Sequence, residues 1–75
     1  MPTRTIETKM TRIDPEEVKR KIREHGYHLT DMAVYLQPYY ELRTDAYHHF
    51  KYWLRVGRMP TEKYKMMCEV LDGTV

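Results

Sequence analysis

One stretch of the chain, Thr44 to Pro60 (TDAYHHFKYWLRVGRMP), carries the side chains best suited to bind a ligand. On a helix, positions spaced at i, i+4, i+7 and i+11 share one face, and here they are polar or basic: Thr44, His48, Lys51 and Arg55. Lysine and arginine neutralise phosphate charge, whereas threonine and histidine hydrogen-bond phosphates or base edges. This face therefore predicts the binding of a polyanion such as DNA.

Another face of the same helix is apolar or small. Its members recur at helical spacing: Ala46, Phe50, Trp53, Leu54 and Gly57. Gly57 can end the helix by taking a left-handed conformation, and Pro60 cannot continue it. An ordinary amphipathic core helix would show the same pattern, so the stretch by itself leaves both interpretations open.

The positive charge of the chain is unevenly distributed. The net charge is only +2, but residues 46–65 carry +4 and residues 1–12 carry +2. Residues 13–24 balance at zero, while residues 25–45 and 66–75 carry −2 each. Such a separation is typical of a surface that binds a polyanion rather than of a uniformly solvated one.

Other chemistries find little support in the sequence. Cys68 stands alone, and the neighbouring His48 and His49 point to different sides of a helix, so no structural zinc site is predicted. The sequence contains no Gly-rich phosphate loop and no cluster of acids and bases. We therefore expect a protein that is not an enzyme, with no cofactor and no metal.

Length and composition predict a single intracellular domain. With 75 residues, 41% of them hydrophobic and 32% charged, the chain fits one soluble globular domain. Its single cysteine excludes an internal disulfide, and no apolar run resembles a signal peptide or a membrane helix. A domain this small is only marginally stable alone, so we expect a cytoplasmic homodimer, associated with the nucleoid if it binds DNA.

The first helix is predicted from Asp14 to His25. Asp14 is a suitable N-cap, and Glu17 stands where it would close a capping box. Val18 and Ile22 form the stripe that should be buried. A basic run on the same helix is interpreted as a solvated face: Lys19, Arg20, Lys21 and Arg23.

A second helix is predicted from His28 or Thr30 to Gln37, and Pro38 stops it. Its apolar positions are Leu29, Met32, Ala33 and Leu36. The third helix is expected to have Thr44 as its N-cap, and the last, Glu62 to Leu71, to be capped by Thr61. Between the second and third helices, residues 38–43 are either a loop whose Tyr39, Tyr40 and Leu42 fold onto the core or an extension of a flanking helix.

The predicted organisation is a flexible basic arm (residues 1–13), an all-α domain (residues 14–72) and a short tail (residues 73–75). The arm allows three interpretations: a frayed terminus, a basic segment that follows phosphates or enters a minor groove, or a strand that pairs with its copy in a dimer. The domain is expected to be a compact bundle of four short helices.

Over residues 14–72 this arrangement resembles the lambda-repressor-like (Cro/repressor-type) helix-turn-helix family. The likeness rests on the segment WLRVGRMP, on the Gly57-Arg58-Met59-Pro60 turn and on a last helix that ends in CEVL. Met32-Ala33 stands where the family has Leu-Ala. Two features depart from the family: Gln37-Pro38 replaces the usual turn glycine, and the connection to the third helix is longer, with residues 39–43 inserted.

The resemblance implies a small DNA-binding transcriptional regulator of phage or plasmid type, whose bundle contains a helix-turn-helix. The helix over residues 44–56 would lie in the major groove of double-stranded DNA. Near base edges and phosphates it would place Thr44, Tyr47, His48 and Lys51. Near the DNA backbone it would place Arg55 and Arg58, and Arg43 beside the insertion is a further candidate. Tyr47 and Tyr52 are equally well explained as half-buried core residues.

A protein-interaction module on the same fold is the alternative. Tyrosines are enriched in the binding hot spots of protein interfaces. Four of them would anchor a host or regulatory protein: Tyr39, Tyr40, Tyr47 and Tyr52.

Overall fold

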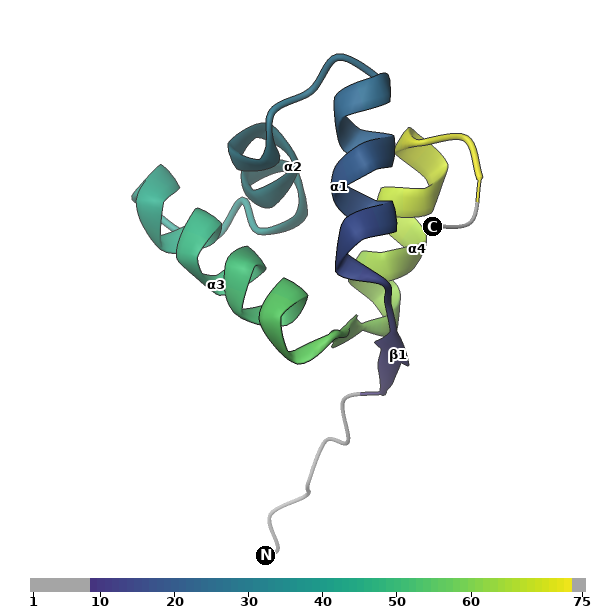
Figure 1. Ribbon diagram of the computed structural model, residues 1–75. Helices are drawn as coiled ribbons and strands as arrows, with labels where there is room; N and C mark the ends of the chain where they lie inside the picture. Colours follow the sequence, from purple (N-terminus) through teal and green to yellow (C-terminus); the bar gives the residue numbers. More distant parts are fainter. Residues whose placement is uncertain (1–8, 74–75) are drawn as a thin grey trace, which may run out of the picture.

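Within residues 9–73, which the computed structural model describes, the chain forms four helices and two short strands. Their order is β1 (Met10–Arg12), α1 (Pro15–Glu24), α2 (Leu29–Leu36), α3 (Arg43–Val56), β2 (Arg58–Pro60) and α4 (Thr61–Val70). Figure 1 shows α2 and α3 on one side of the molecule and α1 and α4 on the other, with the strands below. The mostly helical fold agrees with the sequence prediction, and the strand pair is an addition to it.

The core collects the apolar positions that helical spacing had singled out. Val18 and Ile22 of α1 are fully buried, as are Phe50 of α3 and Met67 of α4. The other buried apolar residues come from α2, α3, β2 and the segments that follow β1 and α4: Ile13, Met32, Ala33, Leu36, Ala46, Trp53, Leu54, Met59 and Leu71. Because these side chains share one cluster, each helix has a single permitted face toward it.

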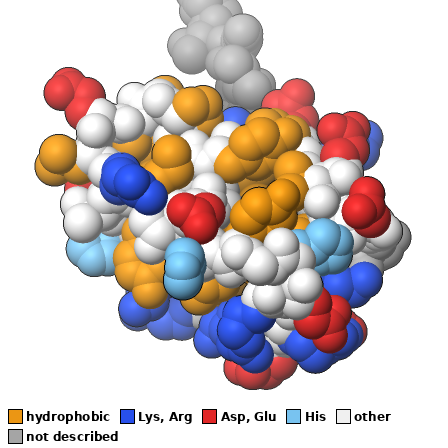
Figure 2. Space-filling model, turned by 90° about the horizontal axis from the view of Figure 1, so that it is seen from above, with side chains coloured by type: hydrophobic (Ala, Val, Ile, Leu, Met, Phe, Trp, Pro, Cys, Tyr) orange, Lys and Arg blue, Asp and Glu red, His pale blue; other side chains and the backbone are white. Residues whose placement is uncertain are grey.

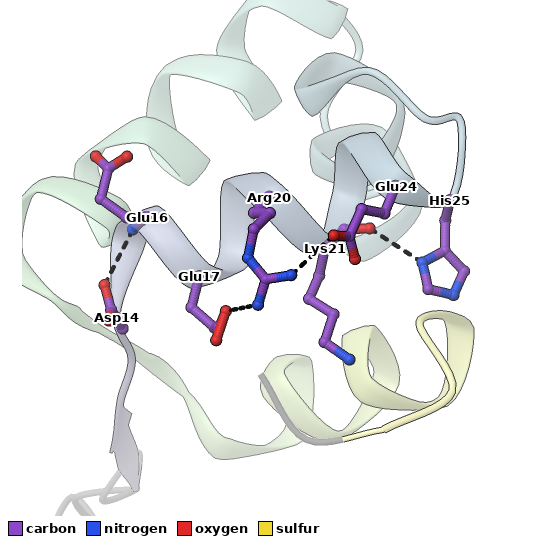
Figure 3. Close-up of polar contacts among 7 residues, drawn as sticks. All are labelled: Asp14, Glu16, Glu17, Arg20, Lys21, Glu24 and His25. Carbon is purple, nitrogen blue, oxygen red and sulfur yellow. Dashed lines mark hydrogen bonds and ion pairs between the residues drawn. The ribbon is translucent and has the colours of Figure 1, made fainter.

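The start of α1 is capped as predicted, but its charged residues pair differently. The Asp14 carboxylate accepts a hydrogen bond of 3.1 Å from the Glu16 backbone N–H. The predicted capping box is wrong, since the Glu17 carboxylate pairs with Arg20, which also donates to Glu24 at 2.8 Å (Figure 3). These hydrogen bonds raise the pKa of the Arg20 guanidinium above its usual value. Within the basic run of α1, Arg20 is thus paired with acids of the same helix, and Lys19 lies 3.9 Å from Glu16.

Helix α2 begins after His28, the earlier of the two predicted starts, where the His28 backbone N–H donates to Asp31 at 3.0 Å. Helix α3 begins earlier than predicted, because its N-cap is Leu42 rather than Thr44. An ion pair of 3.6 Å between Arg43 and Asp31 joins the first turn of α3 to α2. The helix thus begins before Thr44, its best local capping residue.

Residues 37–42 form an ordered turn, and of the segment 38–43 only Arg43 is helical, as the first residue of α3. Tyr39 and Leu42 are 62% and 59% exposed, so the prediction that they fold onto the core is wrong. Tyr40 instead contacts α3 at the half-buried His49, whose Nδ1 lies 3.2 Å from the Tyr40 hydroxyl. Gln37, directly after α2, is the residue of this connection that is buried.

The two strands join the N-terminal segment to the turn after α3. They pair antiparallel, with Met10 opposite Pro60 and Arg12 opposite Arg58. Residues 10–13, part of the predicted arm, therefore belong to the folded domain, and β1 pairs within its own chain. The predictions for residues 1–8 lie outside the described residues.

Helix α4 is fixed at its start by the same N-terminal segment. The N-cap is Pro60, so the predicted capping by Thr61 is wrong. Thr61 is the first helical residue, and its hydroxyl forms a 2.8 Å hydrogen bond with the Thr11 hydroxyl. The Thr61 backbone N–H donates to the Lys9 carbonyl at 2.9 Å. A partner far away in sequence has thus replaced local capping.

We expect Ile13→Ala to lower the free energy of unfolding by about 2–4 kcal/mol, because a buried isoleucine that is truncated leaves a cavity. Ile13 is only 8% exposed, and its backbone N–H also donates to the Gly57 carbonyl at 2.9 Å. The matched control is Leu42→Ala at an exposed site, for which a change within about 0.5 kcal/mol is expected. Urea unfolding of both variants measures the difference, and equal effects would show that the segment before α1 contributes nothing to the core.

Candidate nucleic-acid interface

The outer face of α3 carries the polar residues that the sequence pattern placed together. Four side chains spaced along the helix are exposed: Thr44, His48, Lys51 and Arg55. They face outward because Phe50, Trp53 and Leu54 occupy the buried side. Three of them, together with Tyr52, line a shallow hollow on this surface: His48, Lys51 and Arg55.

The two cations of this face lie over tyrosine rings. Lys51 Nζ is 5.3 Å from the centroid of the Tyr47 ring, and Arg55 Cζ is 5.7 Å from that of Tyr52. A cation–π contact at an exposed site contributes about 0.5–1 kcal/mol and leaves the charge in place. Among residues 9–73, neither cation has a carboxylate at ion-pair distance. Both charges are therefore available to an anion.

The two tyrosines differ in burial. Tyr47 is partly buried and packs against the core, which agrees with its interpretation as a half-buried core residue. Tyr52 is 50% exposed, so it is a surface residue. Lys51 thus lies over a ring that packs against the core, whereas the Tyr52 ring is exposed to solvent.

The remaining two predicted site residues are Arg43, the first residue of α3, and Arg58, just beyond its last residue. Arg43 lies in the first turn and is already paired with Asp31. Arg58 is exposed on β2, beyond Gly57, whose φ of 77° makes the turn. A helix of 14 residues is about 20 Å long, so the predicted residues form a line rather than a cluster.

Lys19 of α1 joins this surface, although its sequence context had indicated a solvated helix face. It lines a hollow between α1 and α3 that contains both α3 cations, together with Pro15, Leu29, Tyr47 and Leu54. Lys19 Nζ is 3.9 Å from an exposed Glu16 carboxylate oxygen, a loose ion pair. In the sequence, one feature indicated this position: Lys19 directly follows Val18 and so borders the buried stripe of α1.

A buried amide fixes how α3 lies against α2. Gln37 is 1% exposed, and its Nε2 donates to the Ala46 carbonyl at 2.9 Å. Its Oε1, which can only accept, lies 2.6 Å from His49 Nδ1, so that nitrogen must carry the proton. The His49 ring in turn packs 4.7 Å from the Trp53 ring. The long connection between the two helices therefore begins at a residue that is bound to both α2 and α3. This contact was not predicted from the sequence.

An aromatic flank lies beside the basic face, formed by Tyr39, Tyr40, His49 and Tyr52. The Tyr39 and Tyr40 rings are 5.1 Å apart, and those of His49 and Tyr52 are stacked at 6.4 Å. Partial desolvation of this largely exposed side chain and the neighbouring Tyr40 raise the pKa of the Tyr39 hydroxyl. Lys63 Nζ is 5.2 Å from the Tyr39 ring.

The structure also has an apolar hollow that neither Lys51 nor Arg55 lines. Seen from above the view of Figure 1, hydrophobic side chains gather in the middle of one face (Figure 2). An apolar hollow in the molecule is lined by Asp31 together with residues of α2, α4 and the turn before α2: Tyr27, Met32, Tyr35 and Val70. A lining without cations suits contact with protein rather than with a polyanion.

Residues 9–73 contain no group of three His, Cys, Asp or Glu side chains placed to hold a metal ion. No helix in that range has the length and apolar character required to cross a bilayer. Comparison of the chain with protein-family models, with curated proteins and with solved structures gave no match. The case for a function therefore rests on the geometry of the described residues.

We expect Gln37→Met to lower the free energy of unfolding by about 1–3 kcal/mol, because it removes the hydrogen bonds of a buried amide and takes from the partly buried His49 N–H its 2.6 Å acceptor. Methionine keeps the length of the side chain, so the loss reports the hydrogen bonds rather than a cavity. The control is Tyr40→Phe, which removes an exposed hydroxyl and should change stability by less than about 0.5 kcal/mol. Thermal unfolding gives the stability, and ¹⁵N NMR of His49 tests the proton on Nδ1. Unchanged stability, or a proton on Nε2 alone, would contradict the contact.

Proposed function

We propose that this chain is a small sequence-specific DNA-binding regulator in which α2 and α3 form a helix-turn-helix and α3 enters the major groove. The observation that carries the proposal is the outer face of α3, where Lys51 and Arg55 lack acid partners among residues 9–73 and share a line with Thr44 and His48. Phosphate neutralisation supplies most of the affinity of such a face.

The dimensions of α3 suit this role. The major groove is about 12 Å wide and admits one α-helix, and a recognition helix contacts base edges mainly through its N-terminal residues. Thr44 and His48 occupy the first half of α3 and would hydrogen-bond base edges. Arg55 and Arg58, at the other end, would reach phosphates, and Lys19 would extend the positive surface onto α1.

Arg43, in the first turn of α3, could bind a phosphate only by leaving its ion pair with Asp31. Arg43 is held by Asp31 at 3.6 Å, with both side chains well exposed. An exposed ion pair contributes little, about 0–1 kcal/mol, so a phosphate can replace the carboxylate at small cost. Tyr47 would act indirectly, by holding Lys51 over its ring.

A regulator of this kind binds DNA as a homodimer, whose two recognition helices meet half-sites about 34–36 Å apart. Such dimerisation would also stabilise a domain of this size. The homodimer, the regulatory role and the phage or plasmid type are parts of the proposal.

A second candidate function is binding of a regulatory or host protein through the aromatic flank. The observation that favours it is the exposure of Tyr39 and Tyr52, since large tyrosine surfaces open to solvent are typical of protein interfaces. The flank and the basic face can be changed separately, because Tyr39 and Tyr40 belong to the connection before α3.

We expect Lys51→Ala with Arg55→Ala to weaken binding to random-sequence duplex DNA by roughly 10- to 100-fold and to lower the slope of log K against log salt by about two. Fluorescence anisotropy at about 50 and 200 mM salt measures both quantities. The charge-matched control is Lys21→Ala with Arg23→Ala, in the last turn of α1.

Tyr39→Ala with Tyr40→Ala should leave DNA affinity nearly intact and should abolish a protein complex if the second function holds. Absence of DNA binding by the unaltered chain at 50 mM salt would contradict the proposed function. Equal loss from the lysine–arginine pair and its control would instead show that the outer face of α3 has no special part in binding.

A further inference from the structure

The two strands bring a pair of arginines together at the end of α3. In the antiparallel register Arg12 of β1 is directly opposite Arg58 of β2. Opposite residues point to the same side of a strand pair, and both of these side chains are exposed. The middle pair points to the other side, where Met59 is fully buried. The arginines therefore occupy the outer side of the pair.

The backbone hydrogen bonds show which of the two types of antiparallel residue pair Arg12 and Arg58 form. Ile13 N–H donates to the Gly57 carbonyl, and Thr61 N–H donates to the Lys9 carbonyl. Hydrogen-bonded and non-hydrogen-bonded pairs alternate along an antiparallel ladder, so Arg12 and Arg58 form a non-hydrogen-bonded pair. In such pairs the Cα atoms are only about 4.5 Å apart, and the side chains are correspondingly close.

Like charges directly opposite each other destabilise a strand pair. In α1, acids of the same helix neutralise the charge of Arg20. Within residues 9–73, by contrast, neither Arg12 nor Arg58 has a carboxylate at ion-pair distance. The outer side of the pair offers no acid either, because its other members are Met10 and Pro60. An anion between the two guanidinium groups would remove the repulsion.

We propose that Arg12 and Arg58 together hold one backbone phosphate of the duplex bound by α3. This inference rests on the proposed function and extends it to Arg12, outside the helix. Arg58 follows Arg55 by three residues, around the turn at Gly57, so the pair continues the positive line of α3. A guanidinium presents a planar fork of N–H donors, and two forks from neighbouring strands match the oxygens of a single phosphate.

The test compares R12Q, R58Q and the double variant R12Q/R58Q by fluorescence anisotropy with random-sequence duplex DNA between about 50 and 200 mM salt. We expect each single change to weaken binding about tenfold, as loss of a charge-assisted hydrogen bond does. Because the arginines share one phosphate, the double variant should lose less than the product of the two effects. Its salt slope should fall by about one, which corresponds to one phosphate.

Two controls separate this site from a general effect of charge or of folding. R23Q removes an exposed arginine from the last turn of α1 and should alter neither affinity nor slope. The thermal midpoint of R12Q/R58Q should equal or exceed that of the unaltered chain, because a like-charge contact has been removed. R12K/R58K, which keeps both charges but loses the fork, should keep the salt slope and lose affinity.

Four outcomes would overturn the proposal. An unchanged salt slope in R12Q/R58Q, alongside lost binding in the Lys51→Ala and Arg55→Ala variant, would reject the arginine site and leave the proposed function standing. Effects that multiply, with a slope change of about two, would mean that the arginines hold separate phosphates. A lowered thermal midpoint in R12Q/R58Q would assign them a structural role. Absence of DNA binding by the unaltered chain would reject the proposed function, and this inference with it.

Discussion

Burial of one side of α3 is the constraint on which the rest of the structure depends. Phe50, Trp53 and Leu54 leave the helix a single orientation against the core, and the polar residues must then face solvent in one line. Core and candidate interface are thus two consequences of the same helical period. A change that rotated α3 would disrupt both, since neither side of the helix can serve in place of the other.

Contacts at the two ends of α3 convert that orientation into a defined position. At the N-terminal end, the Gln37 amide joins the Ala46 carbonyl to the His49 ring. At the C-terminal end, Gly57 turns the chain into β2, which β1 holds through backbone hydrogen bonds. A helix fixed at both ends presents its outer residues with little freedom, which favours selective binding because less ordering is required when a ligand arrives.

The arrangement of acids distinguishes the basic surfaces from each other. In α1, Glu17 and Glu24 pair with Arg20, so part of a basic run in the sequence is neutralised within its own helix. On α3 and the strand pair, Lys51, Arg55 and Arg58 have no such partners within residues 9–73. The proposed contact with DNA is therefore supported by unpaired cations that lie in one line along α3 and continue onto β2, rather than by the number of cations alone.

The sequence by itself determined the helices, their buried sides and the polar line on α3, because helical period, capping residues and breakers act over a few neighbouring residues. Only the tertiary structure decided the burial of Gln37, the place of Lys19 in the hollow beside the α3 cations and the pairing of Arg12 with Arg58. Each of these joins segments that are separate in the chain, and three-residue strands carry too little pattern to be recognised. The N-caps of α3 and α4 also differ from prediction: they are Leu42 and Pro60, and the first helical residues Arg43 and Thr61 contact α2 and the N-terminal segment.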